Sequence, residues 1–113
     1  MSFPLSFLPN EYVDFWVEAQ DDIAEIGYYF DQRAPEVKNR FYRAIDKTIE
    51  QLVRSPNLGE RHPSRSPKLN NMRQWQVDGF PNHAIFYRPV GDRLEILRVL
   101  HGARNYAACF NGD

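Results

Sequence analysis

The sequence predicts one α+β domain, in which an N-terminal strand precedes an antiparallel helical hairpin that packs on an antiparallel sheet completed by three C-terminal strands. Two stretches with helical periodicity follow each other, with a break at Ala34-Pro35. Three alternating stretches with glycine-containing turns between them come next, and consecutive hairpins of this kind build a sheet that a helical pair can cover. The length of 113 residues, with 42% hydrophobic and 26% charged residues, fits one globular domain and excludes a disordered chain.

The N-terminal boundary of the domain is expected near residue 12. Residues 1–11 place a short apolar segment between Pro4 and Pro9 and are expected to form an arm, so that the single domain spans residues 12–113. Residues 12–16 (YVDFW) alternate and are rich in aromatic side chains, which predicts a strand.

Two helices are predicted between this strand and Ser55-Pro56. Spacings of three and four residues place the apolar side chains of each helix on one face. Pro35 suits the first turn of the second helix, and a short connection makes the pair an antiparallel hairpin. The stripe residues are Ala19, Ile23, Ile26 and Phe30 in the first helix, and Val37, Phe41, Ile45, Ile49 and Leu52 in the second.

The C-terminal half predicts three strands after a polar loop at residues 57–71. Residues 73–77 alternate, residues 83–88 are apolar on both faces as in a central strand, and residues 93–100 form the last strand. Residues 79–82 and Gly91-Asp92 supply the turns. A short helix is expected over residues 103–110.

Several function classes are excluded or unsupported. The chain has no phosphate-binding glycine loop, no G-x-S-x-G segment and no H-E-x-x-H, so no cofactor is expected. One cysteine rules out an internal disulfide, and histidines at 62, 83 and 101 do not have metal-ligand spacing, so no metal is expected. Without a long apolar run or a recognisable signal peptide, we expect a cytoplasmic protein with no membrane partner.

The charges are divided unevenly along the chain, although the formal net charge is only −1. Residues 1–32 hold seven acids and no Lys or Arg, whereas residues 33–113 hold all 14 bases and eight acids. This division favours an acidic face opposite a basic one, or two halves that neutralise each other across the fold.

Arginines and one histidine on or just after the last strands are the candidate polar residues: Arg73, Arg88, Arg98, His101 and Arg104. Arg98 shares alternation with Leu94, Ile96 and Leu100, so it requires a partner. That partner is either a helix carboxylate, Asp22 or Glu25, or an external anion. His101 is either an acid–base group or a hydrogen-bonded structural residue.

Aromatic side chains are dense, and most are expected in the core. A small domain covers its apolar surface incompletely, so an exposed remainder predicts a groove in which a partner helix or strand docks. We expect Tyr29, Trp75 and Phe86 to form part of this partner-binding surface.

Five segments together form a recognisable pattern: D-D-I-A-E-I-x-x-Y at 21–29, R-F-Y-R-A-I at 40–45, L-x-x-x-P-x-L-G-E-R at 52–61, M-R-Q-W-x-V at 72–77, and G-F-P-N-H-A-I-F-Y-R with G-D-R-L-E-I-L-R-V-L-H-G-A-R-N at 79–105. Over residues 12–106 the chain resembles toxins of the RelE/ParE superfamily from bacterial type II toxin–antitoxin modules. The resemblance is closer to the ParE, or plasmid stabilization, branch.

The resemblance implies a growth-inhibiting toxin with a cognate antitoxin, whose C-terminal segment wraps and neutralises it in a hetero-oligomer. ParE-like members poison DNA gyrase and need no nuclease residues, so we expect a gyrase inhibitor rather than an enzyme. RelE-like members cut mRNA in the ribosome, and this endoribonuclease activity is the alternative. A third possibility is an inactive family member that only binds antitoxin.

The resemblance also assigns roles to residues. Arg98, His101 and Arg104 are expected to bind the target, while Tyr29, Trp75 and Phe86 are expected to bind the antitoxin. For a nuclease, the catalytic set would be Arg73, His101 and Arg104. Two departures count against that set: Lys68 stands alone where nucleases hold several lysines, and Phe110 occupies the place of their tyrosine, with Tyr106 too early.

Overall fold

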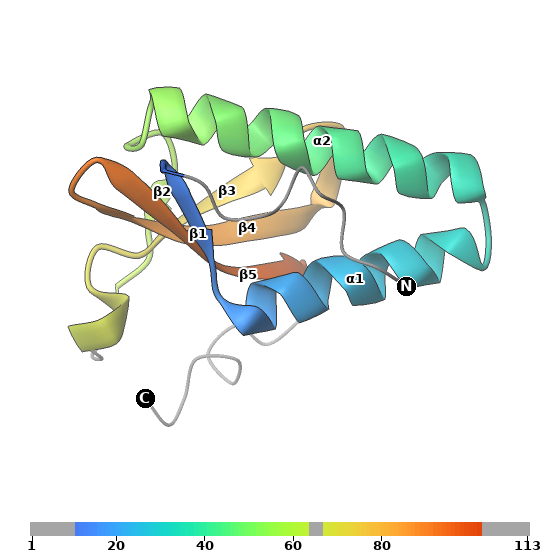
Figure 1. Cartoon of the computed structure of the whole chain (residues 1–113), viewed down its shortest axis with the longest axis horizontal. Coiled ribbons are helices and arrows are strands. Elements are labelled where there is room, and N and C mark those ends of the chain that lie inside the picture. Colours follow the sequence, from blue (N-terminus) through green and yellow to red (C-terminus); the bar gives the residue numbers. More distant parts are fainter. Residues whose placement is uncertain (1–10, 64–66, 103–113) are drawn as a thin grey trace.

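A computed structural model describes residues 11–63 and 67–102 of the chain. Two helices lie on one side of a five-stranded sheet, as Figure 1 shows. The elements are β1 (Val13–Phe15), α1 (Val17–Asp31), α2 (Pro35–Arg54), β2 (Glu60–Arg61), the short 3-10 helix η2 (Pro67–Leu69), β3 (Arg73–Val77), β4 (Phe80–Val90) and β5 (Arg93–His101). None of the helices in the described ranges is both long and apolar enough to cross a bilayer.

The strands form a single mixed sheet in the order β1-β5-β4-β3-β2. The three C-terminal strands pair antiparallel, which confirms that part of the prediction. β1 instead runs parallel to β5, with Val13 opposite Leu94, so the sheet is not wholly antiparallel. Two parallel neighbouring strands require a long connection, and the elements from α1 to β4 form the connection between β1 and β5 here. The two-residue strand β2 was not predicted, because its residues are charged and exposed.

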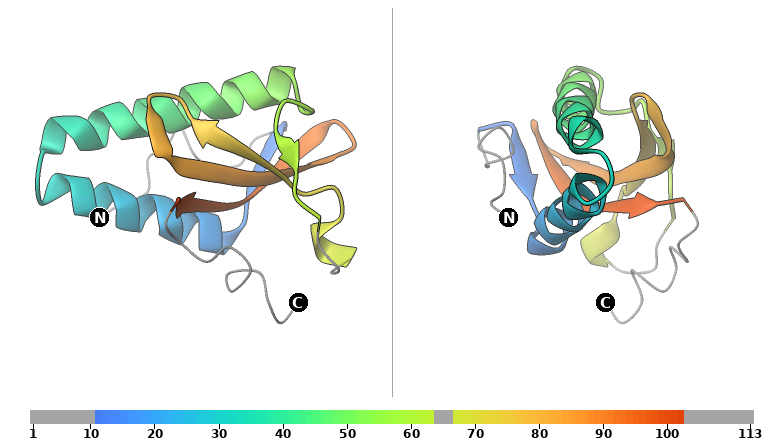
Figure 2. Two further views of the ribbon diagram at one scale, coloured as in Figure 1. Left: turned by 180° about the vertical axis from the view of Figure 1, so that it is seen from behind. Right: turned by 90° about the vertical axis from the view of Figure 1, so that its right-hand side faces the viewer.

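The two helices form the expected antiparallel hairpin and cover one face of the sheet (Figure 2). Pro35 opens α2, where its missing N–H costs no helical hydrogen bond. Gly27 lets α1 and α2 approach closely, because a Cβ at this position would overlap the ring of Tyr42. A glycine that weakens an isolated helix therefore serves the packing of the pair.

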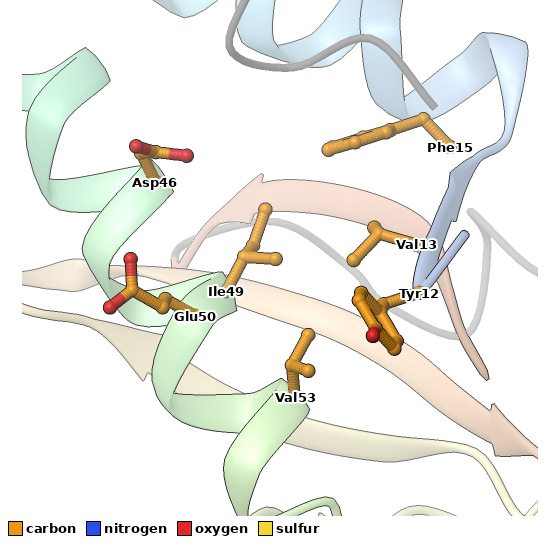
Figure 3. A pocket seen from close by; sticks show the side chains of 7 residues that line it. All are labelled: Tyr12, Val13, Phe15, Asp46, Ile49, Glu50 and Val53. Carbon is orange, nitrogen blue, oxygen red and sulfur yellow. The ribbon is translucent and has the colours of Figure 1, made fainter. Parts of the chain in front are cut away.

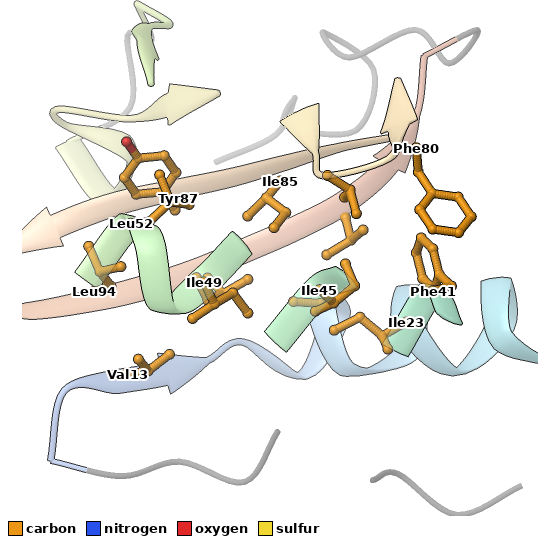
Figure 4. Packing of buried hydrophobic residues seen from close by; sticks show 14 residues of the cluster. Val13, Ile23, Phe41, Ile45, Ile49, Leu52, Phe80, Ile85, Tyr87 and Leu94 are labelled. Atoms are coloured by element: carbon orange, nitrogen blue, oxygen red, sulfur yellow. The ribbon is translucent and has the colours of Figure 1, made fainter. Parts of the chain in front are cut away.

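The main core lies between the helices and the sheet (Figure 4). Both predicted helical stripes contribute to it, and Phe41, Ile45 and Leu52 of α2 are fully buried. Its buried members are Val13, Ala19, Ile23, Phe41, Ile45, Ile49, Leu52, Val77, Phe80, Ile85, Tyr87, Leu94, Ile96 and Val99.

A second buried cluster gathers other side chains of β4 and β5 with two from the segment before β3: Leu69, Met72, Ala84, Phe86, Leu97 and Leu100. A β-bulge in β5 changes which residues face the main core, since the pairing shifts between Phe86 and Tyr87 and leaves Leu97 as an extra residue. Because of the bulge, Arg98 does not share a face of the strand with Leu94 and Ile96, although the alternation predicted that it would. Leu94 and Ile96 before the bulge belong to the main core, whereas Leu100 after it belongs to the second cluster.

Candidate partner-binding groove

A groove of about 860 Å³ opens at the hairpin end of the molecule. We call it the hairpin groove. Its walls come from the second half of α1, the start of α2, the turn between β3 and β4, and the ends of β4 and β5 that meet there. It is lined by Glu25, Ile26, Tyr28, Tyr29, Phe30, Gln32, Arg33, Val37, Arg40, Gly79, Phe80, Pro81, Asn82, His83 and His101.

The floor of the hairpin groove is built from interlocking rings. Phe30 of α1 lies 5.9 Å from Phe80 of β4, and Phe41 of α2 lies 5.1 Å from Phe80 in an edge-to-face arrangement, measured between ring centroids. His83 joins the same cluster, 5.2 Å from Phe41 and 6.0 Å from Phe30. Such edge-to-face contacts stabilise a fixed geometry, so the floor is a rigid apolar surface.

The rim carries exposed aromatic side chains and two arginines. Tyr28 and Tyr29 are 57% and 52% exposed, although both are large enough to favour burial. Arg33 stacks on the Tyr29 ring, with its guanidinium carbon 3.7 Å from the centroid, and its Nη1 donates to the Tyr29 carbonyl oxygen at 3.1 Å. The guanidinium carbon of Arg40 lies 5.5 Å from the centroid of Phe80. An arginine stacked in this way keeps N–H groups at its edge for a carboxylate.

Two histidines meet at the inner end of the groove. His83 and His101 face each other across β4 and β5, with ring centroids 5.1 Å apart. His83 is 9% exposed, and its Nδ1 is buried without a hydrogen-bond partner in the described structure. Burial, and secondarily the neighbouring His101, lower the pKa of His83 below its ordinary 6.5. Burial therefore favours the neutral form of the His83 side chain.

The structure places Arg98 away from the groove, in an ion pair with α1. Its Nε and Nη2 donate to the two carboxylate oxygens of Asp22 at 2.7 and 2.9 Å. Asp22 also accepts a hydrogen bond from the backbone N–H of Val99 at 3.0 Å. Val99 lies in the part of β5 that extends beyond its pairing with β1. Of the two interpretations of Arg98, the helix carboxylate is the observed one.

Arg73 supports a loop. Its Nη1 donates to the Gly59 carbonyl oxygen at 2.7 Å and to that of Asn57 at 3.3 Å. Tyr87, its neighbour on β4, donates from its hydroxyl to the Pro56 carbonyl oxygen at 2.7 Å and accepts from the Gly59 N–H at 2.9 Å. These bonds fasten the segment between α2 and β2 to the sheet.

The three aromatic residues predicted to bind a partner occupy three different places. Tyr29 lies on the rim of the hairpin groove. Trp75 is half-buried against the main core and lines an adjoining hollow of about 230 Å³. Phe86 is fully buried in the second cluster and has no surface to offer, which corrects its assignment. The error arises because alternation gives no information about whether the second face of β4 is covered.

Some predicted residues lie outside the described ranges, namely Arg104, Tyr106 and Phe110, together with the helix expected over residues 103–110. His101 ends β5 and is exposed at the groove. Sequence reasoning missed His83, Arg33 and Arg40 as groove residues. The pairing of His83 with His101 was the available signal, but it required the strand register.

A smaller hollow of about 190 Å³ lies between β1 and α2 (Figure 3). Val13 and Phe15 of β1 face Ile49 and Val53 of α2 across it, with Asp46 and Glu50 along one side. Burial, followed by the nearby Glu50, raises the pKa of Asp46. Within residues 11–63 and 67–102, no three His, Cys, Asp or Glu side chains gather as a metal site would require.

Comparison with known proteins gives consistent matches. A family model described as the ParE toxin of the type II toxin–antitoxin system, parDE, matches residues 13–106. Toxin ParE1 from Caulobacter vibrioides is 33% identical over 91 residues, which is 80% of this chain and 88% of that protein.

Solved structures share the fold at lower identity. A chain in the chromosomal ParDE TA system from P. aeruginosa matches with a TM-score of 0.63 and 20% identity, over 80% of this chain and 94% of that one. A chain in the YoeB–YefM complex from Staphylococcus aureus matches with a TM-score of 0.54 and 15% identity, over 82% of this chain and 98% of that one.

Proposed function

Because the chain belongs to the ParE family of toxins from type II toxin–antitoxin systems, we propose that it arrests growth by inhibiting DNA gyrase and that an antitoxin neutralises it by filling the hairpin groove. The observation that carries the first half is the engagement of Arg73, one of the candidate nuclease residues, in hydrogen bonds that hold the segment between α2 and β2. The observation that carries the second half is the exposed aromatic rim over an apolar floor.

Arg73 and His101 are too far apart to act on one phosphodiester bond. Arg73 pairs with Tyr87 and His101 pairs with His83, so they are separated by four residues along β4, about 14 Å, and by two strand spacings across the sheet, about 10 Å. A general base and a charge-stabilising group must both lie within about 3 Å of the reacting atoms. Arg73 is also engaged with the Gly59 carbonyl. Both facts favour a protein that inhibits by binding and disfavour a nuclease.

The surface that would meet gyrase includes His101 at the end of β5, together with Arg104 beyond the described residues. Arg98 contributes indirectly, since its bonds to Asp22 hold α1 against β5 near that end. A net charge of −1 also favours a protein target over ribosomal RNA, because affinity for RNA depends largely on neutralising phosphates.

The antitoxin partner is supported by the relatives and by the surface. The matched chains from P. aeruginosa and Staphylococcus aureus come from a ParDE system and a YoeB–YefM complex. In this chain, the hairpin groove combines an apolar floor with two exposed tyrosines, a composition typical of the anchoring part of a protein interface.

The test uses purified gyrase. We expect the chain to block supercoiling of relaxed plasmid and to increase gyrase-dependent DNA cleavage, and we expect addition of the antitoxin encoded beside its gene to restore supercoiling. Ribosome-bound mRNA should stay intact in a parallel reaction. Unchanged supercoiling together with cut mRNA would replace gyrase with the nuclease alternative, and no effect in either reaction would indicate an inactive member that only binds antitoxin.

A further inference from the structure

We propose that Arg33 and Arg40 recognise carboxylate side chains of the segment that fills the hairpin groove, so that the occupant is an amphipathic antitoxin segment whose acidic residues meet the hairpin end. This inference rests on the proposed function, since it specifies the chemistry of the antitoxin segment. It concerns two residues that the sequence patterns did not single out.

The apolar part of the site selects one face of the occupant. Ile26, Phe30, Val37 and Phe80 line the groove, and the ring contacts beneath Phe30 and Phe80 hold the floor in place. A volume of about 860 Å³ holds several large side chains. An occupant that presents apolar residues along one face would remove this surface and Tyr29 from water together.

The charged part of the site is the pair of arginines on its rim. In the part of the chain that the structure describes, no carboxylate oxygen lies within 4.0 Å of the guanidinium of Arg33 or Arg40. The guanidinium carbon of Arg33 lies 3.7 Å from the centroid of the Tyr29 ring, and that of Arg40 lies 5.5 Å from the centroid of the Phe80 ring. A guanidinium that is already oriented by stacking loses little further freedom when it binds a carboxylate, so the Arg33 side chain is preorganised for an acidic partner, and Arg40 adds a second cation within cation–π range of Phe80.

The charges also give the site a direction. Arg33 follows the end of α1 and Arg40 lies in the second turn of α2, so both cations are near the connection of the hairpin. An acidic residue of the occupant is favoured beside these two arginines, which places the acidic part of the segment at the connection between α1 and α2.

The experiment measures the Kd between this chain and the product of the neighbouring antitoxin gene. The test variant is R33E/R40E, and the matched control is Arg43→Glu, because Arg43 is an exposed cation of α2 that does not line the groove. We expect the double variant to weaken binding about 100-fold or more, and the control to change it less than about 2-fold. Raising the salt concentration should weaken the wild-type complex and affect the double variant much less.

Three further measurements keep the outcomes distinct. Thermal unfolding checks that R33E/R40E is folded, and reversal of the antitoxin carboxylates to lysine should restore its binding. Val37→Glu places a charge on the floor and should abolish binding in either case. If Val37→Glu abolishes binding but R33E/R40E binds like the wild type, the recognition by arginines is wrong and the groove assignment stands. If wild type does not bind the antitoxin, or Val37→Glu binds as tightly, the groove assignment of the proposed function fails.

Discussion

The hairpin groove and the strand arginines (Arg73, Arg88, Arg93 and Arg98) lie in different parts of the molecule and use their guanidinium groups differently. Each strand arginine has a partner inside the chain: Arg98 binds Asp22, Arg88 binds Glu95, Arg93 binds Asp14 and Arg73 binds the Gly59 carbonyl. The groove arginines instead stack on aromatic rings at the rim. The strand arginines therefore stabilise the fold, and the capacity to bind a partner lies at the hairpin end.

Replacing Asp22, the partner of Arg98, tests the role of the strand arginines and should change the free energy of unfolding more than the other substitutions. Asp22→Ala leaves the guanidinium of Arg98, which is 18% exposed, without its carboxylate, and leaves the Val99 N–H without an acceptor. We expect a loss of about 3 kcal/mol in the free energy of unfolding, measured by urea denaturation. A D22A/R98L double variant should recover part of this loss, because it also removes the cation that has lost the Asp22 carboxylate. A loss below about 1 kcal/mol for Asp22→Ala would show that the anchor is unimportant.

Gly27→Ala tests the contact between α1 and α2, the two helices that form walls of the hairpin groove. Alanine favours a helix by about 1 kcal/mol over glycine, so propensity alone predicts stabilisation. The structure predicts a loss of about 2 kcal/mol instead, because the new methyl group overlaps the Tyr42 ring. The same substitution in a Tyr42→Ala background should be neutral or stabilising. A stabilised single variant would contradict the close approach of α1 and α2.

Low pH should lower the stability of the fold through His83, which lines the hairpin groove. Its pKa is lower in the folded chain than the ordinary 6.5, because burial disfavours the charged imidazolium. The unfolded chain therefore binds more protons as the pH falls, so this contribution is constant above the ordinary pKa and is lost below it. We expect the free energy of unfolding to fall between pH 7 and pH 5.5, measured by urea denaturation at each pH. The slope should be smaller in His83→Gln, and equal slopes would contradict the assignment.

An exposed ion pair on α2 should give the smallest effect. Arg54 pairs with Glu50 at 3.1 Å, one helical turn apart, and both side chains are mostly exposed. Arg54→Ala should change the free energy of unfolding by less than about 0.5 kcal/mol in the same urea assay. This value sharpens the comparison, because it separates a surface pair from the enclosed Arg98–Asp22 pair. A loss as large as that of Asp22→Ala would erase the distinction.

The sequence predicted most of the fold because its signals are local. Stripes at helical spacing located both helices, and alternation with glycine turns located the three C-terminal strands. The parallel placement of β1 beside β5 was not predictable in this way, since it depends on residues about 80 positions apart. The bulge at Leu97 defeated the alternation rule for Arg98, because one inserted residue exchanges the faces of the strand.

The candidate site was less predictable than the fold. Tyr29 was identified from the density of aromatic residues, whereas Phe86 was assigned to the surface although the second cluster buries it. Arg33, Arg40 and His83 come together only through the hairpin and the register of β4 with β5. Local periodicity does not show which segments, distant in the sequence, line the same groove.

The central claim, that the chain inhibits gyrase rather than cutting RNA, is tested most directly by pulse-labelling DNA and protein synthesis after the chain alone is induced in a bacterial host. Our account predicts that DNA synthesis falls first, within minutes, and that cells become filamentous as expected when gyrase fails. If protein synthesis falls first while DNA synthesis continues, the account is contradicted, and Arg73, His101 and Arg104 become the residues to substitute.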